Sequence, residues 1–151
     1  MEIGIHGTQM MGARWTPADA CVTGYGKIRG RWVATIAYDF TVLGGSIGHT
    51  AEIKATRVRE IALRERMPVV WLVDSGGARI APQDNPHSDM ISMFAGSGYL
   101  FKEQVLMSGV VPQVAAMVGP GAAGTAYIPA LADFVPMVKG TSSMALGGPA
   151  L

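Results

Sequence analysis

The sequence predicts an α/β domain in which a parallel sheet is built from strand–strand–helix units. Three observations indicate this class: two β-rich runs joined by a tight turn, a helical stretch after them, and two later apolar runs that each end in a glycine-rich loop. Strands that alternate with helices are typical of parallel sheets. A chain of 151 residues is long enough to bury a single core.

The composition excludes several classes of protein. Hydrophobic residues make up 49% of the chain and charged residues only 15%, against about 25% charged residues in ordinary domains. Such an apolar chain is not disordered. A formal net charge of +1 excludes a basic nucleic-acid-binding surface or an acidic tail as the main feature. The low charge indicates that a larger assembly covers part of the surface.

The first third of the chain predicts a hairpin after an irregular lead-in at 1–18. The segments 20–28 (ACVTGYGKI) and 31–38 (RWVATIAY) are β-rich. Gly30 lies between them and supplies the positive φ that a tight hairpin needs. The strand pattern then breaks at 39–48, which contains paired glycines.

A helix is predicted over 49–66. Its apolar stripe is formed by small or branched residues at helical spacing: Ala51, Ala55, Val58 and Ala62. The charged residues are expected to face mostly away from that stripe, and they are Lys54, Arg57, Glu60, Arg64 and Glu65. Met67-Pro68 ends the helix, because a residue before proline disfavours the helical region.

The second half predicts two more strands with helices between them. The continuous apolar run 69–73 (VVWLV) is typical of a strand buried on both faces. A long helix is expected at 88–107, and a second buried strand at 110–118. The remaining predicted elements are a short helix through Leu131 and short strands at 134–138 and 142–146 around the turn Lys139-Gly140.

The segment from Gln104 to Ala132 contains no charged residue and by length could span a membrane. Prolines interrupt it at 112, 120 and 129, and its glycines cluster at 119–124. A buried strand, a loop and a helix therefore explain it better than a transmembrane helix. One cysteine, Cys21, excludes an internal disulfide. No signal or transit peptide is visible, so we expect a cytoplasmic protein, or one of the mitochondrial matrix if it is eukaryotic.

Two predicted loops, Asp74–Arg79 and Gly119–Gly124, each follow a buried strand and precede a helix. Ligands bind at the carboxyl ends of parallel strands, and glycines let the backbone approach a ligand closely. Two such loops side by side could stabilise an oxyanion through backbone N–H groups. They could equally be tight strand-to-helix turns.

Other site classes find less support. The histidines His6, His49 and His87 lack metal-ligand spacing. Asp-Ser-Gly-Gly at 74–77 also occurs in trypsin-like proteases, but the α/β pattern does not fit that fold, and neither the G-x-S-x-G nor the P-loop motif is present. The remaining candidates are expected to serve packing or interfaces: Cys21, Trp15, Trp32, Trp71, Met90, Met93 and Met107.

Four segments of the sequence resemble the carboxyltransferase β subunits of biotin-dependent acyl-CoA carboxylases, such as propionyl-CoA and 3-methylcrotonyl-CoA carboxylases. They are YDFTVLGGSIG (38–48), VDSGGARI (73–80), SGVVPQVAAMVGPGAAGTAYIPALADF (108–134) and MALGGPAL (144–151). The resemblance implies a crotonase-like superhelix of ββα units. Because a complete subunit of the family has two such domains, it also implies that residues 1–151 form only part of the N-terminal domain.

The resemblance further implies carboxyl transfer from carboxybiotin to an acyl-CoA. In this family the first domain binds the CoA ester, while biotin arrives on a partner carrier protein and the second domain of a neighbouring subunit completes the site. The implied partners are acyl-CoA, a biotin carboxylase or biotin carrier subunit, and further copies of the carboxyltransferase. No metal, nucleic acid or membrane is implied.

Matched to this sequence, the resemblance assigns the backbone N–H groups of Ala123 and Gly124 as oxyanion donors. The family has a glycine where this chain has Ala123. The residues expected to line the CoA and thioester region are Gly76, Gly77, Ala78, Arg79, Gly121 and Ala122. For Arg79 two roles are open, a phosphate contact or a structural ion pair.

Two alternatives remain within this fold. One is a subunit of a biotin-dependent acyl-CoA decarboxylase, and the other is a non-catalytic, truncated remnant. A hydratase is disfavoured, because those relatives carry active-site glutamates and this chain has no acidic residue from Gly119 to Ala132. We expect the isolated 151-residue chain to be inactive in carboxyl transfer.

Overall fold

The fold is organised around one mixed sheet in the order β1-β2-β3-β4-β5-β6. The computed structural model describes residues 2–3, 15–79 and 101–147. The strands are β1 (Glu2–Ile3), β2 (Cys21–Ile28), β3 (Arg31–Tyr38), β4 (Val69–Ser75), β5 (Gln113–Ala122) and β6 (Ser143–Ala145). β1, β2 and β3 pair antiparallel, and β3 to β6 pair parallel.

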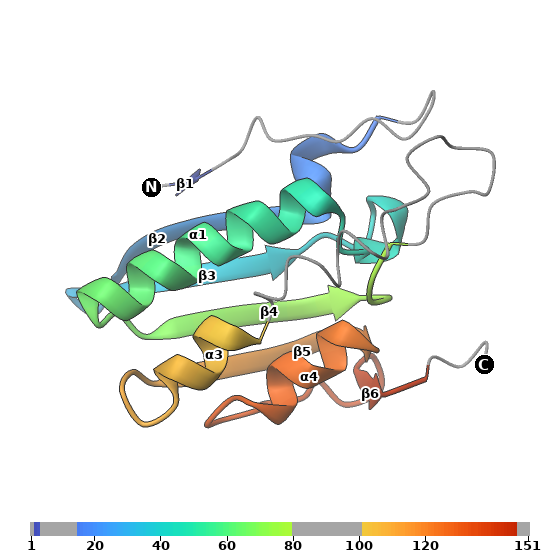
Figure 1. Cartoon of the computed structure of the whole chain (residues 1–151). Helices are drawn as coiled ribbons and strands as arrows, with labels where there is room; N and C mark the ends of the chain where they lie inside the picture. The colour runs from blue at the N-terminus through green and yellow to red at the C-terminus, as the bar shows by residue number, and fades with distance from the viewer. Residues whose placement is uncertain (1, 4–14, 80–100, 148–151) are drawn as a thin grey trace.

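The helices are α1 (His49–Glu65), α3 (Lys102–Met107) and α4 (Gly124–Ala130), with short 3-10 turns η1 (Pro17–Ala20) and η2 (Leu43–Gly45). Figure 1 shows α1 lying along β2 and β3, and α3 and α4 lying over β5 on the same side of the sheet. No described helix is long and apolar enough to span a membrane.

The predicted hairpin and first helix are confirmed. Gly30 has φ +82° in the turn between β2 and β3, and the two strands pair along their whole length from Cys21–Tyr38 to Ile28–Arg31. The predicted stripe Ala51, Ala55, Val58 and Ala62 is buried in the core. It packs over a sheet layer that includes Ile36, Val69, Trp71, Val73 and Met117. Small side chains on α1 therefore allow the helix to lie close to the sheet.

The prediction that β4 is buried on both faces is wrong. Burial alternates along the strand, and Leu72 is 39% exposed. The reason is that the described helices all cover the same face of the sheet. Val22 of β2 and Val118 of β5, both 40% exposed, also lack a covering layer among the described residues.

The predicted boundary between the second buried strand and its loop is also wrong. β5 begins at Gln113, after Pro112, and continues through Gly119 to Ala122. Two neighbours explain the extension: Gly121 pairs with Ser75 of β4 and with Met144 of β6. A glycine-rich segment can thus remain extended when strands on both sides supply hydrogen-bond partners.

The C-terminal elements agree with prediction in part. The predicted short helix is confirmed as α4, and β6 lies within the predicted 142–146 strand. The segment 134–138 makes only isolated bridges, through Phe134 and Met137, rather than a strand. Of the helix predicted at 88–107, the structure describes α3, while Met90 and Met93 lie outside the described residues. Met107 is fully buried, as is Trp71, whereas Trp15 and Trp32 are exposed.

Charged side chains lie beneath α1 as well as on its surface. The expectation that Lys54 faces away is wrong, because it is 6% exposed and its ammonium donates to the carbonyls of Ala18 and Cys21. Arg59, also buried, pairs with Glu52 at 2.5 Å and with Glu103 of α3 at 3.5 Å. The hydrogen bonds of Lys54 tie α1 to the N-terminal turn, and the ion pair between Arg59 and Glu103 ties it to α3. Partners of this kind are needed because a buried charge is costly when it is left unpaired.

Candidate functional site

The two segments predicted as loops lie side by side at the carboxyl ends of β4 and β5, although part of each belongs to its strand. Ser75 pairs with Gly121 at the end of the parallel ladder. The segments that follow the two strands therefore begin next to each other at the same edge of the sheet. Gly77 has φ +97°, and a Cβ built there would lie 2.7 Å from the carbonyl oxygen of Ala122. Only glycine allows this approach, which brings the two loops into contact.

Thr125 is a polar link between the loops that the sequence analysis did not identify. Its hydroxyl oxygen accepts the N–H of Ala122 at 3.0 Å, and it lies 2.8 Å from the carbonyl oxygen of Ala122 and 3.2 Å from that of Ser75. The signal for it was a hydroxyl residue in the first turn of a helix, where side-chain oxygens often satisfy nearby backbone groups. Thr125 is buried, so these contacts fix the start of α4 against the end of β4.

Most backbone groups of the Gly76–Arg79 loop are used within the fold. The N–H of Gly76 donates to Gly44 at 2.9 Å, and that of Arg79 donates to Ile47 at 2.9 Å. The N–H of Gly77 donates to the Ser75 hydroxyl at 3.2 Å. Ala78 is the exception, because its N–H has no acceptor within the described part of the chain.

The two predicted oxyanion donors differ in their surroundings. The N–H of Ala123 lies 3.2 Å from the carbonyl oxygens of both Ala145 and Leu146, next to β6. Gly124 is the first residue of α4, and its N–H has no acceptor among the described residues, as is general for the first residues of a helix. Within the described part of the chain, the backbone donors at this edge that have no acceptor are therefore those of Gly124 and Ala78.

Ala123 occupies a conformation that favours glycine. Its φ of 49° and ψ of −121° lie outside the regions that residues with a Cβ ordinarily adopt. Its methyl carbon lies 3.3 Å from the position that a Cβ on Gly77 would take. The alanine thus adds backbone strain and a methyl group at the junction of the two loops.

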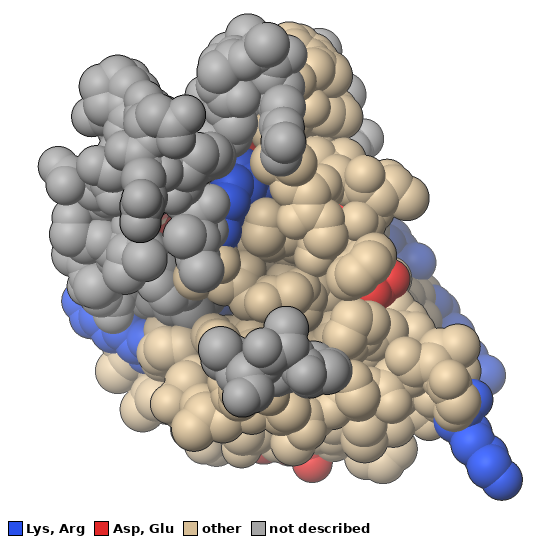
Figure 2. Space-filling view, turned by 90° about the vertical axis from the view of Figure 1, so that its right-hand side faces the viewer, with Lys and Arg blue, Asp and Glu red and all other residues tan. Residues whose placement is uncertain are grey.

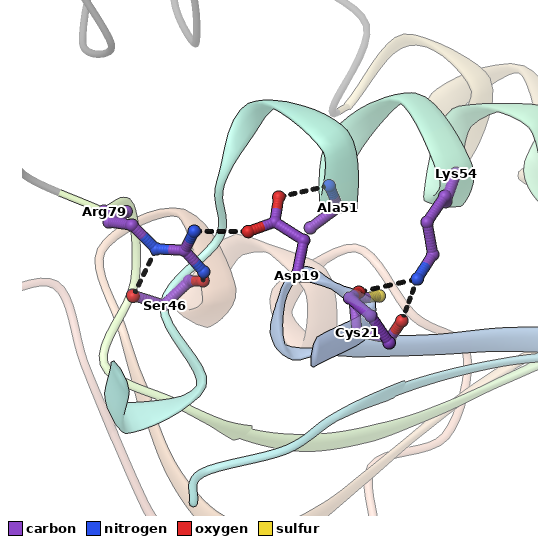
Figure 3. Close-up of polar contacts among 7 residues, drawn as sticks. Asp19, Cys21, Ser46, Ala51, Lys54 and Arg79 are labelled. Carbon is purple, nitrogen blue, oxygen red and sulfur yellow. Dashed lines mark hydrogen bonds and ion pairs between the residues drawn. The ribbon is translucent and has the colours of Figure 1, made fainter. Parts of the chain in front are cut away.

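Arg79 lies in a buried ion pair. Its side chain is 3% exposed, and its guanidinium contacts the carboxylate of Asp19, which is fully buried. It also donates to the hydroxyl of Ser46 at 3.0 Å and to the Ser46 carbonyl at 2.8 Å (Figure 3). Of the two roles left open by the sequence, the contacts of the described residues are those of the structural ion pair.

Asp74 is a second polar residue that the sequence analysis did not assign to the site. The ladder between β4 and β5 is irregular here, since Val73 pairs with Met117 and Ser75 pairs with Gly121. The Asp74 carboxylate fills the space beside Gly119, where a Cβ would lie 2.0 Å from Oδ1. Burial raises the pKa of Asp74 above its usual value, and the nearby Asp39 carboxylate raises it further.

The rest of this edge is largely uncharged. Figure 2 views the molecule from the end at which β4 and β5 terminate, and most of the described surface there belongs to uncharged residues. Cys21 is buried nearby in β2, and burial raises the pKa of its thiol to about 12. Among the described residues, this edge therefore offers backbone N–H donors, while the thiol of Cys21 is a poor nucleophile.

Comparison with known proteins connects this geometry to one family. The family model for the carboxyl transferase domain matches residues 3–151. The chain is 44% identical over 135 residues to the methylmalonyl-CoA decarboxylase subunit alpha of Veillonella parvula, covering 89% of this chain and 25% of that protein. It is 42% identical over 131 residues to the propionyl-CoA carboxylase beta chain of Roseobacter denitrificans, covering 87% of this chain and 24% of that protein.

Solved structures agree on the fold. A structure of transcarboxylase 12S, described as a hexamer assembly with methylmalonyl-coenzyme A and methylmalonic acid bound, matches with a TM-score of 0.87 at 39% identity over 99% of this chain. The geranyl-CoA carboxylase beta subunit of P. aeruginosa matches with a TM-score of 0.74 at 32% identity over 88% of this chain. The chain spans 29% and 25% of those two proteins. The predicted crotonase-like α/β fold is thereby confirmed over this part, and the chain belongs to the carboxyl transferase domain family.

Proposed function

We propose that this chain supplies the acyl-CoA-binding part of a carboxyltransferase site, at the carboxyl ends of β4 and β5. The observation that carries the proposal is the pair of backbone N–H groups, of Gly124 and Ala78, that have no acceptor among the described residues at this edge. Relatives that act on CoA esters match nearly the whole chain. The chain spans about a quarter of the length of those relatives.

Carboxyl transfer to an acyl-CoA requires hydrogen-bond donors that stabilise an oxyanion. When the α-carbon of an acyl-CoA loses a proton, negative charge develops on the thioester oxygen. Preorganised N–H groups stabilise this charge without reorganising during the reaction. In the proposed site the thioester oxygen accepts from Gly124 N–H, with Ala78 N–H as the second donor. The contacts of Thr125 and of Gly77 hold the two loops at a fixed separation.

Ala123 has a different role in this proposal from the one its sequence position predicts. Its N–H already lies against the Ala145 and Leu146 carbonyls, so it anchors the start of α4 to β6. Gly121 and Ala122 belong to the strand and present their backbone to the other loop. The acyl-CoA therefore meets the end of β5 and the first turn of α4 rather than a long glycine loop.

We expect biotin to reach this edge on a partner carrier protein rather than to be bound here permanently. The described residues offer oxyanion donors and an uncharged surface, and Arg79, the cation of the loop, is held by Asp19. Carboxybiotin on a partner carrier protein would supply the carboxyl group. The residues of this chain would orient the acyl-CoA, exclude water from its α-carbon and stabilise the thioester oxygen.

A decarboxylase subunit is the second candidate. The observation in its favour is the similarity to the methylmalonyl-CoA decarboxylase subunit alpha, whose 44% identity is close to the 42% of the propionyl-CoA carboxylase beta chain. Both reactions pass through the same charge on the thioester oxygen, so the same donors serve either. A non-catalytic remnant is the third candidate, and it would retain the fold without binding the ester.

Titration calorimetry with propionyl-CoA tests the proposal. The ligands are propionyl-CoA and its thioether analogue, which lacks the carbonyl oxygen. We expect the chain to prefer the thioester, because only the thioester accepts the Gly124 hydrogen bond. One hydrogen bond contributes about 1 kcal/mol, which corresponds to roughly fivefold in affinity.

The matched variants are Gly124→Pro and Gly124→Ala. Proline is tolerated at the first position of a helix and removes the N–H, whereas alanine keeps it. Gly124→Pro should abolish the preference for the thioester, and Gly124→Ala should retain it. A folded wild-type chain that binds no acyl-CoA would support the remnant and overturn the proposal.

A further inference from the structure

A hollow of 820 Å³ lies at the end of the sheet opposite to the proposed acyl-CoA site. It lies between the β2–β3 turn, the last turn of α1, and Pro68 and Pro112, which precede β4 and β5. We call it the hairpin hollow. Its volume falls in the range of about 300–1,000 Å³ that is usual for small-molecule sites. Neither the comparisons nor the proposed function assigns a role to it.

One wall of the hairpin hollow is aromatic. Trp32 is 48% exposed, and its ring meets that of Tyr25 edge-to-face, with centroids 5.7 Å apart. The ammonium of Lys27 lies 5.0 Å from the centre of the same indole ring. Ile61 and Met67 add apolar surface. The contacts with Tyr25 and Lys27 hold the indole in place, so the hollow presents a fixed aromatic surface to a planar ring.

The hollow is also basic. Three arginines line it, Arg31, Arg64 and Arg66, with Glu65 as the single acidic residue among the lining residues. Arg64 pairs with Glu65 at 2.8 Å. The side chains of Arg31 and Arg66 make no ion pair with any described residue. The chain as a whole has a net charge of +1, so two guanidinium groups at one hollow, without an ion pair among the described residues, concentrate positive charge there.

Helix electrostatics explain only part of this charge. The C-terminus of a helix favours cations, which accounts for Arg64 and Arg66 at the end of α1. It does not account for Arg31, which comes from the first residue of β3. Two different elements therefore place a guanidinium group at the same hollow, beside an exposed indole.

We propose that the hairpin hollow binds an adenosine phosphate. The phosphates pair with Arg31 and Arg66, because the planar guanidinium group matches phosphate oxygens in a bidentate way. The base lies against Trp32 and the apolar surface of Ile61 and Met67. This chemistry occurs in free nucleotides and in the nucleotide end of CoA. The inference does not depend on the proposed carboxyltransferase function, because it uses none of the residues of that site.

Titration calorimetry on the whole chain with ADP, adenosine, inorganic phosphate and CoA tests the proposal. We expect ADP to bind more tightly than either adenosine or inorganic phosphate, since only ADP uses both halves of the hollow. The Arg31→Gln/Arg66→Gln double variant should weaken ADP binding by at least tenfold. Both arginines are exposed, and circular dichroism should show an unchanged fold.

The matched control is Arg57→Gln, which removes an exposed arginine of α1 that pairs with Glu60 outside the hollow. Trp32→Leu should reduce ADP affinity and leave phosphate affinity unchanged. Competition between CoA and ADP in the wild type identifies the nucleotide end of CoA as the source, and independent binding identifies free nucleotide. Absence of ADP binding, an equal loss in Arg57→Gln, or equal affinities for ADP and inorganic phosphate would each overturn the proposal.

Discussion

The carboxylate of Asp19 joins Arg79 to the first turn of α1. One of its oxygens contacts the Arg79 guanidinium, and the other accepts the N–H of Ala51 at 2.7 Å. The residue before α1 is Gly48, which has no side chain to cap the helix. A residue far away in sequence therefore performs the capping, and the same residue holds the loop that follows β4 (Figure 3).

Loss of this carboxylate should destabilise the protein strongly. Asp19→Ala leaves the guanidinium of Arg79 buried without its partner, and breaking a buried pair in this way costs about 3–5 kcal/mol. Urea unfolding followed by circular dichroism measures the change. The control is Arg57→Ala, which removes an exposed pair and should change the free energy of unfolding by less than about 1 kcal/mol. Equal effects of the two variants would show that the Asp19–Arg79 pair is not structural.

Glycine at position 123 should stabilise the chain. Ala123 has φ 49° and ψ −121°, and relief of such strain is worth about 1 kcal/mol or more. Ala123→Gly should therefore raise the melting temperature. Ala122→Gly is the matched control, because Ala122 is an ordinary strand residue and glycine there should be destabilising. If both substitutions lower the melting temperature, Ala123 is not strained.

The pKa of Asp74 should show that its carboxylate is partly buried beside β5. Its pKa lies above the usual 3.8 in the folded chain, because of burial and then of Asp39. The folded state therefore binds the proton more tightly than the unfolded state, so the contribution of Asp74 to stability is present below pH 3.8 and is lost as the pH rises through the raised pKa. Carbon-13 NMR of the side-chain carboxyl measures this pKa directly.

Two variants check the causes of that shift. Asp39→Asn should lower the pKa of Asp74 by removing the neighbouring negative charge. Asp74→Asn should stabilise the chain at pH 7, with a gain that diminishes as the pH is lowered. A pKa of Asp74 at or below 3.8 would contradict the described burial.

Cys21 should be chemically inert in the folded protein. It is fully buried, and its thiol has a pKa of about 12, so very little thiolate exists at pH 8. Labelling with a thiol reagent at pH 8 should be slow in buffer and fast in concentrated urea, which serves as the internal control. Equal rates in the two conditions would mean that the β2 segment is open in solution.

The sequence predicted those parts of the fold that depend on local patterns. The hairpin at Gly30 and the stripe from Ala51 to Ala62 follow from turn chemistry and helical spacing. The glycine-rich end of β5 did not, because its extended form depends on pairing with β4 and β6. A segment whose partners lie far away in sequence cannot be assigned from its own composition.

In the candidate site, too, local patterns predicted some features, while others depend on long-range contacts. The sequence pointed to the two segments at the ends of β4 and β5, which the parallel ladder brings together, but it took Gly119 to Ala122 for a loop where they continue the strand. The roles of individual groups depended on contacts that no local pattern encodes. Asp19 meets Arg79 across 60 positions, Thr125 meets Ser75 across 50, and Ala123 N–H meets the carbonyls next to β6. These long-range contacts decide which backbone donors remain available.

Infrared difference spectroscopy of a bound thioester measures directly whether Gly124 N–H donates to the thioester oxygen. Propionyl-CoA labelled with carbon-13 at its carbonyl reports hydrogen bonding to that oxygen through the frequency of the carbonyl stretch. We expect a shift to lower frequency on binding to the wild-type chain and to Gly124→Ala, and a smaller shift with Gly124→Pro. A bound thioester whose carbonyl frequency is the same in all three proteins would contradict the claim that Gly124 N–H stabilises the thioester oxygen.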